Sequence, residues 1–450
     1  MQAVAVSAAP SQAGYVQRGV NTLQQVFRDH FARFAADYDS RYAKDLGNFR
    51  IERISRVATR FLTCGDYRQG VARIRCVNPE CRHEFFRPFS CKGFFLCPSC
   101  SQKRTLLFAE YLDEQLLLAL PHRQAVQWPA LGFVFTLPKA LRVFLRHDQR
   151  LFAKLARLIF NLIVQFYRTA AGKPITTAAV IAYQPFGDSL RFNPHFHALI
   201  LEGGFDSTGQ FYHLPIHDTS RLAECLRQRT IGLFLKLGLI TQPFAENLLC
   251  WRHSGFSVDN SVRLDGGDHK ARQALAQYIA RAPLSLQKLT YDRLDGRLLY
   301  HTDYNPYFKQ NITLWDAADF IAALTQFVPP WGVRYVHYYG LYSSRCKASW
   351  PHLPHVARLA PAAWKDSHPL EVPSEPTPKQ TRTVPPRACR SAWARLTAKV
   401  YEVDPLTCPR CGSEMKLIAV ITDPSEVRKI LRHLIKIGRA PPGLDPGSLD

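Results

Sequence analysis

The sequence contains few acidic residues and no long apolar run. Its 450 residues include 36 Asp and Glu against 58 Lys and Arg, which gives a formal net charge of +22. A membrane-spanning helix needs about 20 consecutive apolar residues, and the longest apolar stretches, such as residues 158–167, reach about half of that length. These absences argue against a membrane protein and against an acidic metabolic enzyme. The basic excess indicates a polyanionic partner, most often nucleic acid.

Common catalytic and export signatures are also missing. The sequence has no HExxH motif, no P-loop and no GxSxG motif, so it lacks these familiar signals of hydrolases and nucleotide-binding enzymes. The first residues have no cationic start before their apolar run, and Pro10 interrupts that run, which is not typical of a signal peptide. We expect residues 1–19 to be a disordered leader and the chain to be intracellular.

Cysteine, by contrast, is abundant, and its clustering indicates bound metal. Six of the 12 cysteines fall within 37 residues, and disulfides are rare in a reducing compartment. A CPxC turn presents two thiolates to one ion, and two such pairs complete a tetrahedral zinc site. Buried free cysteines are the alternative interpretation. The simplest zinc site consists of Cys76, Cys81, Cys97 and Cys100, with Cys64, Cys91 and His83 as competing ligands.

A second CPxC motif provides only half of a zinc site. Cys408 and Cys411 have no second cysteine pair nearby, and Cys389 and His433 are the local candidates for the remaining ligands. We expect a zinc knuckle that is completed by these residues or by another chain. It would lie in a small, basic C-terminal module.

The segment around the first cysteine cluster is both basic and aromatic. Residues 41–104 contain 14 Lys or Arg and 5 Asp or Glu, with five phenylalanines between residues 85 and 95. Basic groups suit phosphates and aromatic rings suit bases, whereas a small zinc module also needs aromatic side chains for its core. We expect most of the phenylalanines to be core and the basic residues, including Lys103 and Arg104, to contact DNA.

The segment FNPHFHALILEGG places two histidines on a predicted strand. His195 and His197 are two residues apart, so they share one face of a strand while Phe196 points into the core. Two imidazoles on one face can hold a divalent ion and leave positions open for catalysis. The alternative is an ordinary strand with two solvent-facing histidines. Gln184, at the end of the preceding strand, is our candidate for the third ligand, and Asp188 is the next.

Tyrosine is the candidate nucleophile for such a site. Tyr278 lies on the last turns of a predicted helix that also carries Arg272 and Arg281, which are near enough to steer a phosphate. Arginine charge and a metal would favour ionisation of a phenol, whose pKa is ordinarily about 10. Tyr278 could instead pack on a helix face, and Tyr338 and Tyr342 are further candidates. The residues alone do not decide between them.

The predicted elements alternate as in an α+β domain. Short apolar runs predict strands, and longer runs with helical spacing predict helices. The order strand–helix–strand–strand–helix fits an α+β or ferredoxin-like unit. Strands are predicted at 131–138, 176–186 and 195–205, and helices at about 15–60, 101–120, 139–168, 217–250 and 268–281.

Composition suggests a division into five segments. Nine of the 31 prolines lie between Pro351 and Pro386, which is typical of a linker. The predicted segments are a leader at 1–19, a helical and zinc-binding DNA-recognition domain at 20–104, a catalytic domain at 105–345, a proline-rich linker at 346–388 and a C-terminal module at 389–450.

Six motifs follow one another along the chain in a fixed order. They are SCKGFFLCPSC, FVFTLPKALR, YQPFGDSLRFNPHFHALILEGGF, YIARAPLSLQKL, HYYGLYSSR and DPLTCPRCGSEMKLIAVI. In this combination they resemble transposases of the rolling-circle insertion-sequence family numbered ninety-one, which have an N-terminal zinc-binding domain and belong to the HUH endonuclease group. The resemblance covers about residues 20–440.

The resemblance implies a fold and a mechanism. The fold would be α+β, with a ferredoxin-like palm of antiparallel strands flanked by helices, an N-terminal zinc module and a small zinc knuckle. His195 and His197 match the family's pair that binds Mg²⁺ or Mn²⁺. Tyr278 matches the tyrosine that forms a 5′-phosphotyrosine bond with single-stranded DNA. Ala282 stands where many members have a second tyrosine, so the chain resembles the single-tyrosine branch.

The resemblance also implies partners and leaves alternatives open. The partners would be single-stranded element ends and target DNA in the bacterial cytoplasm, at the nucleoid, with a homodimer as the assembly considered. A replication initiator or relaxase would use the same chemistry on other DNA. A zinc-dependent DNA-binding regulator would use the histidines structurally, and a transposase with three carboxylates would leave no covalent adduct.

Overall fold

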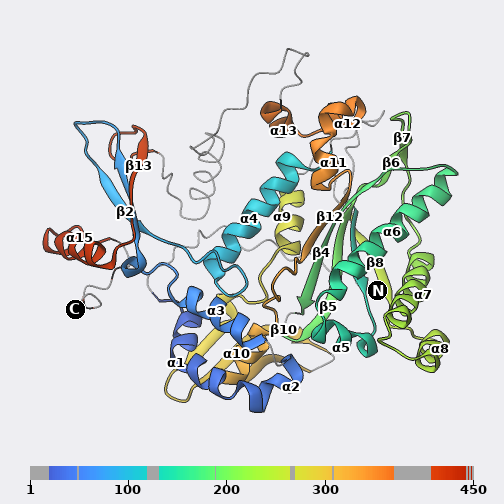
Figure 1. Cartoon of the computed structure of the whole chain (residues 1–450), viewed down its shortest axis with the longest axis horizontal. Coiled ribbons are helices and arrows are strands. Elements are labelled where there is room, and N and C mark those ends of the chain that lie inside the picture. Colours follow the sequence, from blue (N-terminus) through green and yellow to red (C-terminus); the bar gives the residue numbers. More distant parts are fainter. Residues whose placement is uncertain are drawn as a thin grey trace.

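The chain folds as a mixed α/β protein with antiparallel sheets (Figure 1). No helix within the described ranges is both long and apolar enough to cross a membrane. The predicted leader at 1–19 lies outside the described residues. The computed structural model describes residues 20–47, 50–118, 131–187, 189–263, 269–306, 309–368 and 407–441, with residues 444 and 447.

The largest sheet has five strands in the order β12-β4-β5-β3-β8, and every neighbouring pair is antiparallel. The tight β4–β5 hairpin at its centre consists almost entirely of buried residues, as expected for strands covered on both faces. A short hairpin of β6 (Gly203–Phe205) and β7 (Phe211–His213) follows it. The five strands are β3 (Leu131–Thr136), β4 (Ala178–Phe186), β5 (Phe192–Ile200), β8 (Ser257–Arg263) and β12 (Val336–Gly340).

One face of this sheet packs against a layer of helices that forms the main core. Phe196 and Ile181 point to this side and are fully buried. In α6, apolar residues recur at three- and four-residue spacing, so one side of the helix is apolar and covers the sheet. The helices of this layer are α5 (Lys139–His147), α6 (Leu151–Ala171), α7 (Ser220–Lys236) and α8 (Gln242–Cys250).

The opposite face of the sheet is covered by α4 (Pro98–Gln115) and α9 (His269–Ile279). Figure 1 shows these two helices side by side, on the other side of the strands from α6. Val180 and Leu199 of the sheet pack with Ala276 and Ile279 of α9 in this second core. The site described below lies on this face.

The N-terminal helices pack against a later segment rather than forming their own domain. Their buried aromatic residues, such as Phe27 and Phe61, share one core with Leu298 and Phe320. This core crosses the predicted boundary between 20–104 and 105–345, because amphipathic helices need an apolar partner and α10 supplies it. The elements are α1 (Thr22–Ala36), the π-helix η1 (Tyr38–Tyr42), α2 (Ala43–Leu46), α3 (Arg50–Leu62), β9 (Leu289–Asp292), β10 (Arg297–Asn305), β11 (Gln310–Asp316), α10 (Ala317–Thr325) and the 3-10 turn η3 (Leu286–Lys288).

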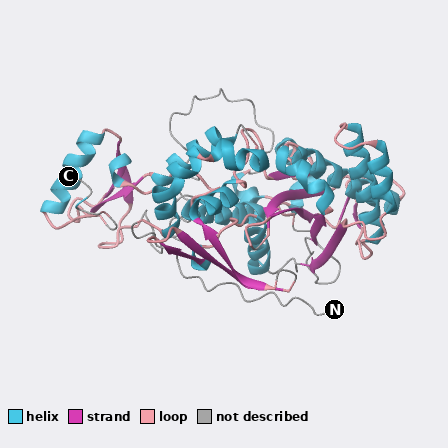
Figure 2. Cartoon of the chain, turned by 90° about the horizontal axis from the view of Figure 1, so that it is seen from below, coloured by secondary structure: helices cyan, strands magenta, loops and turns pink. Residues whose placement is uncertain are grey.

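A hairpin from the N-terminal part of the chain and the C-terminal strand form a small ribbon with the strand order β13-β1-β2. Strand β13 pairs with β1 from Val71↔Ile421 to Cys76↔Met415. Figures 1 and 2 both show the C-terminal helix beside this ribbon, at one end of the molecule. Residues 407–441 of the module predicted at 389–450 therefore pack with the N-terminal hairpin. The ribbon consists of β1 (Val71–Cys76), β2 (Glu84–Pro88), β13 (Met415–Ile421), α15 (Pro424–Lys436) and the 3-10 turn η2 (Tyr67–Gln69).

The first part of the predicted linker is folded. Trp350 and Trp364 are almost completely buried and contact each other. Proline fits the first turn of a helix, so the prolines here begin short helices instead of marking a linker. Residues 369–388 of the predicted linker lie outside the described residues. The helices are α11 (Ser344–Ala348), the 3-10 turn η4 (Trp350–His352), α12 (Pro354–Leu359) and α13 (Ala362–Ser367).

Candidate functional site

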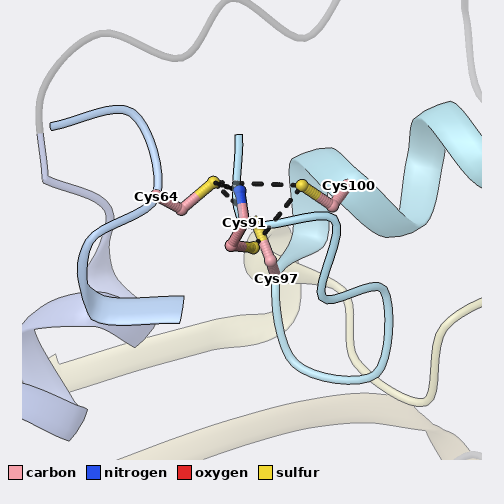
Figure 3. Close-up of side chains that lie close together, drawn as sticks. All are labelled: Cys64, Cys91, Cys97 and Cys100. Carbon is pink, nitrogen blue, oxygen red and sulfur yellow. Dashed lines mark hydrogen bonds between the residues drawn. The ribbon is translucent and has the colours of Figure 1, made fainter. Parts of the chain in front are cut away.

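Four cysteines converge where the N-terminal helices meet α4. The sulfur atoms of Cys64, Cys91, Cys97 and Cys100 all lie within 4.8 Å of one another, and the four residues are buried. Figure 3 shows the sulfurs pointing toward one another. Three of the six sulfur–sulfur separations are 3.5 to 3.9 Å, which matches the spacing of about 3.8 Å that tetrahedral zinc–sulfur bonds of about 2.3 Å require. We call this group tetrad 1.

Local structure explains how the four sulfurs of tetrad 1 meet. Cys64 follows α3, Cys91 follows β2, and Cys97 is the N-cap of α4, which places Cys100 in its first turn. Hydrogen bonds from Cys64, Cys91 and Cys97 hold the pKa of Cys100 well below that of an ordinary thiol. Cys100 therefore favours the thiolate, which is the form that binds zinc, whereas hydrogen bonds with Cys100 raise the pKa of Cys91 and Cys97.

A second group of four cysteines, tetrad 2, joins the β1–β2 hairpin to the C-terminal CPxC motif. Its sulfur atoms also lie within 4.8 Å of one another, with Cys76 at 3.5 Å from Cys411 and Cys81 at 3.7 Å from Cys408. Cys76 ends β1, Cys81 lies in the turn before β2, and the CPxC motif precedes β13. Together with tetrad 1, this arrangement supports structural zinc.

The predicted zinc site of Cys76, Cys81, Cys97 and Cys100 is not brought together. The physical reason is the β1–β2 hairpin. Cys76 and Cys81 lie at its closed end, whereas Cys97 and Cys100 belong to the group at its open end. His433 and His83 belong to neither tetrad, and Cys389 lies outside the described residues. The second site is completed within the chain by Cys76 and Cys81.

The two histidines lie on the α9 side of the central sheet. In the β4–β5 register, Gln184 pairs with His195 and Ala182 pairs with His197. Paired residues share a face of the sheet, so both imidazoles and the Gln184 amide point the same way. Gln184 Oε1 lies 3.0 Å from His195 Nε2 and 2.7 Å from His197 Nε2. Asp188 lies outside the described residues.

The hydrogen bonds of this trio fit a bound cation. His195 Nδ1 lies 2.8 Å from the Asn193 carbonyl oxygen, which can only accept, so Nδ1 donates its proton there. In neutral His195 the Nε2 lone pair then faces Gln184 Oε1, which is also an acceptor. A divalent ion would satisfy both atoms, and mixed N/O donors of this kind suit such ions.

Burial keeps the second histidine in the form that binds metal. His197 is almost fully buried, and this burial, followed by the charges of His195 and Arg281, lowers the pKa of His197 to about 3. His197 is therefore neutral at physiological pH. The side-chain amide nitrogen of Gln184 is buried without a hydrogen-bond partner among the described residues. The polar contacts that position this amide are therefore those of its oxygen with the two histidines.

Tyr278 lies directly beside the histidine pair. Its ring stands edge-on to that of His197, with 5.4 Å between the ring centroids. The Arg281 guanidinium carbon lies 4.5 Å from the centre of the Tyr278 ring. The Tyr278 side chain is 45% exposed, and its hydroxyl has no hydrogen-bond partner in the part of the chain that the structure describes. The phenol is thus open to a ligand, with a positive charge next to it.

The other two tyrosine candidates lie in different surroundings. Tyr338 is on β12, where burial and the neighbouring Tyr111 raise its pKa to about 12. Tyr342 is buried, and this burial raises its pKa further. Both phenols are less able to ionise than an ordinary tyrosine.

The basic residues predicted to contact DNA differ in their surroundings. Arg281 lies between Tyr278 and Phe186. Lys103 and Arg104 are in α4, and the Arg104 guanidinium carbon lies 3.4 Å from the centre of the Phe94 ring. Arg272, for which a phosphate-steering role is predicted, forms an ion pair with Asp113.

Helix α4 connects tetrad 1 to the helix that carries Tyr278. Asp113 of α4 forms the ion pair with Arg272 of α9 at 2.7 Å, and both side chains are largely buried. Thr105 Oγ1 donates a hydrogen bond to the carbonyl oxygen of Ala280 at 3.0 Å. Thr105 and Asp113 carry no sequence signal of their role, because no local motif marks a contact between helices more than 150 residues apart.

Two family models match the chain. Residues 179–349 match the family Y2_Tnp, described as "Putative transposase", and residues 27–127 match Zn_Tnp_IS91, described as "Transposase zinc-binding domain". The first range includes the histidine pair and Tyr278, and the second includes tetrad 1. Cys408 and Cys411 lie outside both ranges. No curated protein and no solved structure matched.

Proposed function

Because its two family matches make this chain an IS91-like transposase, we propose that it cleaves and rejoins single-stranded DNA at insertion-sequence ends. The proposed intermediate is a 5′-phosphotyrosine at Tyr278, as in rolling-circle transposition. The observation that carries the proposal is the placement of Tyr278 beside His197 and Arg281 on one face of the sheet. We further propose that this antiparallel sheet is the palm of an HUH-type nuclease.

The chain's own residues supply the nucleophile and a charge. The Tyr278 oxygen attacks the scissile phosphorus and forms a new P–O bond, and the phenolic proton leaves. The bond between phosphorus and the 3′ oxygen breaks, and that oxygen takes up a proton to become a 3′-hydroxyl. Arg281 neutralises phosphoryl oxygen charge as it develops.

His195, His197 and Gln184 are the residues that would hold Mg²⁺ or Mn²⁺. When bound, such an ion polarises the scissile phosphate. The two histidines and the amide orient the ligand atoms, and the buried sheet beneath them keeps those atoms fixed. Because the phosphotyrosine retains the free energy of the phosphodiester, a 3′-hydroxyl can attack it and rejoin the strand without ATP. Ala282 leaves one tyrosine at this position.

The zinc sites have a structural role in this proposal. Tetrad 1 fixes the start of α4, and α4 in turn contacts α9. The basic N-terminal region around it is proposed to bind the ends of the element, and DNA is the partner that a transposase requires.

A covalent-adduct assay tests this proposal. Labelled single-stranded oligonucleotides that cover the element ends are incubated with the protein and Mn²⁺, then separated on a denaturing gel. We expect a retarded, protease-sensitive band with the wild type and with Tyr338→Phe, but none with Tyr278→Phe. His195→Ala should lose the band and keep DNA binding. Tight binding without any wild-type adduct would contradict the proposal and favour a non-catalytic DNA-binding protein.

A further inference from the structure

Trp331 is exposed to an unusual degree for its residue type. Its side chain is 63% exposed, although tryptophan is on average a strongly buried residue. It lies in the turn between α10 and β12, in the sequence Pro329-Pro330-Trp331-Gly332. A single exposed side chain does not by itself mark a binding site, so the surroundings of Trp331 decide whether it binds a ligand.

The turn that carries Trp331 is held firmly by α3. Arg50 donates hydrogen bonds to the carbonyl oxygens of Gln326 and Val328, and Arg53 donates one to that of Pro329 at 3.3 Å. The two prolines restrict the backbone further. Gly332 follows with φ of +77°, a conformation that favours glycine. The indole is therefore presented to solvent by a rigid turn rather than by a loose loop.

Arginine side chains surround the exposed indole. The guanidinium carbons of Arg53 and Arg56 lie 3.9 and 5.8 Å from the centre of the Trp331 ring. Arg53, Arg56 and Arg60 are three and four residues apart on α3, so they lie on one face of that helix. Burial and then the charges of Arg60 and Arg56 lower the pKa of Arg53. One exposed acidic residue, Glu52, pairs with Arg56. The three arginines outnumber this one carboxylate, and a cluster with such an excess of positive charge attracts phosphate groups.

The turn lies at the end of the sheet that carries the candidate site. Tyr335 accepts a hydrogen bond from the backbone N–H of Tyr183 at 2.7 Å, and Tyr183 directly precedes Gln184. Trp331 and Tyr335 are four positions apart, so the chain between them spans at most about 14 Å. A strand bound at the site can therefore reach Trp331 within a few nucleotides.

We propose that Trp331, with Arg53, Arg56 and Arg60, is a stacking platform for single-stranded DNA that flanks the cleavage site. Every base has a π face that can stack on an indole, and arginines bind the adjacent phosphates, so such platforms accept any sequence. A duplex does not present its base faces, so the platform selects single strands. The inference rests on the proposed function, because it concerns the same DNA strand.

Binding measurements with a tryptophan series test the platform. The probe is fluorescein-labelled oligothymidine of about 30 nucleotides, compared with a duplex of the same length. All variants carry Tyr278→Phe and are measured without divalent metal, so no cleavage occurs. We expect Trp331→Ala and Trp331→Leu to weaken oligothymidine binding about 5- to 100-fold, and Trp331→Phe to retain most of the affinity. Duplex affinity should not change.

Trp251 provides a matched control. It is 38% exposed, its indole N–H donates to Asn247 at 2.6 Å, and it lies at the end of α8. Trp251→Ala should bind oligothymidine like the parent protein, and thermal unfolding should show that all variants are folded.

Three results would overturn the platform: no oligothymidine binding by the parent protein, an unchanged affinity of Trp331→Ala, or an equal loss for single strands and duplex. The covalent-adduct assay is independent of these results. A missing adduct with a Trp331-dependent affinity would refute the chemistry and leave the platform standing.

Discussion

At the scale of single residues, Gln184 is the residue of the candidate site whose side-chain position is most tightly constrained. Its oxygen lies at hydrogen-bond distance from both imidazoles, and its nitrogen is buried without a partner among the described residues. The spacing of His195 and His197 could be interpreted from the sequence, because strand alternation sets their common face. The β4–β5 register decides which residue lies opposite the two histidines. The sequence indicates this register only through the position of the turn between the two strands.

Substitution of Gln184 should weaken the binding of a divalent ion. Gln184→Leu removes one oxygen donor, and we expect it to raise the Kd for Mn²⁺ at least about tenfold, since loss of even an outer-shell partner costs about 10- to 100-fold. Calorimetric titration with Mn²⁺ measures the change.

Thr136→Val is the matched control for this measurement. Thr136 pairs with His195 on the neighbouring strand, and its hydroxyl contacts Ser257 instead of the trio. An unchanged Mn²⁺ affinity in Gln184→Leu, or an equal loss in Thr136→Val, would refute the assignment of Gln184 as a ligand.

At the scale of secondary-structure elements, α4 is the link between zinc and nucleophile. Asp113 and Arg272 hold α4 against α9 through side chains that are 5% and 14% exposed. Breaking a buried ion pair leaves an uncompensated charge, which costs about 3–5 kcal/mol. Asp113→Ala should therefore lower the free energy of unfolding by about this amount and slow adduct formation, because Tyr278 lies on α9.

An exposed ion pair offers the comparison for this prediction. Glu52 pairs with Arg56 at 2.7 Å on the surface of α3, and exposed pairs are typically worth less than about 1 kcal/mol. Denaturant unfolding of Glu52→Ala should show only such a small change. If Asp113→Ala were as stable as Glu52→Ala and formed the adduct at the wild-type rate, the claim that this ion pair holds α9 against α4 would be refuted.

The cysteine motifs show what could be predicted for an element and what could not. The CPxC turns were visible because their spacing is local. The pairing of the cysteines was not, since it follows from the β1–β2 hairpin, which places Cys64 and Cys91 at one end and Cys76 and Cys81 at the other. The first strand of this hairpin could be predicted from the sequence, because the alternating run VARIRC ends at Cys76.

At the scale of the whole molecule, tetrad 2 connects residues more than 300 positions apart. Strand β13 extends the N-terminal ribbon, and Cys408 and Cys411 complete its metal site. Such a contact cannot be predicted from composition, which suggested a separate terminal module instead. The same holds for α10, whose packing against the N-terminal helices crosses the predicted domain boundary.

The zinc content of the protein tests this arrangement. We expect two zinc ions per chain, one for each tetrad. A variant with Cys408→Ser and Cys411→Ser should retain one, because Cys76 and Cys81 alone supply two of four ligands. Elemental analysis by mass spectrometry measures the ratio.

Two exposed cysteines outside both tetrads serve as the control. A variant with Cys225→Ser and Cys250→Ser should keep both zinc ions, because these residues lie in neither group. Two zinc ions per chain in the Cys408→Ser and Cys411→Ser variant would show that the C-terminal pair is not needed for the second site.

Mapping the residue that carries the DNA tests the central claim most directly. After reaction with a single-stranded element end, the protein is digested with trypsin and nuclease, and the modified peptide is identified by mass spectrometry. The account predicts a nucleotide on the peptide of residues 273–281, at Tyr278. A nucleotide on the peptide of residues 335–345, which contains Tyr338 and Tyr342, would contradict the assignment of the nucleophile. Cleavage without any modified peptide would contradict covalent catalysis.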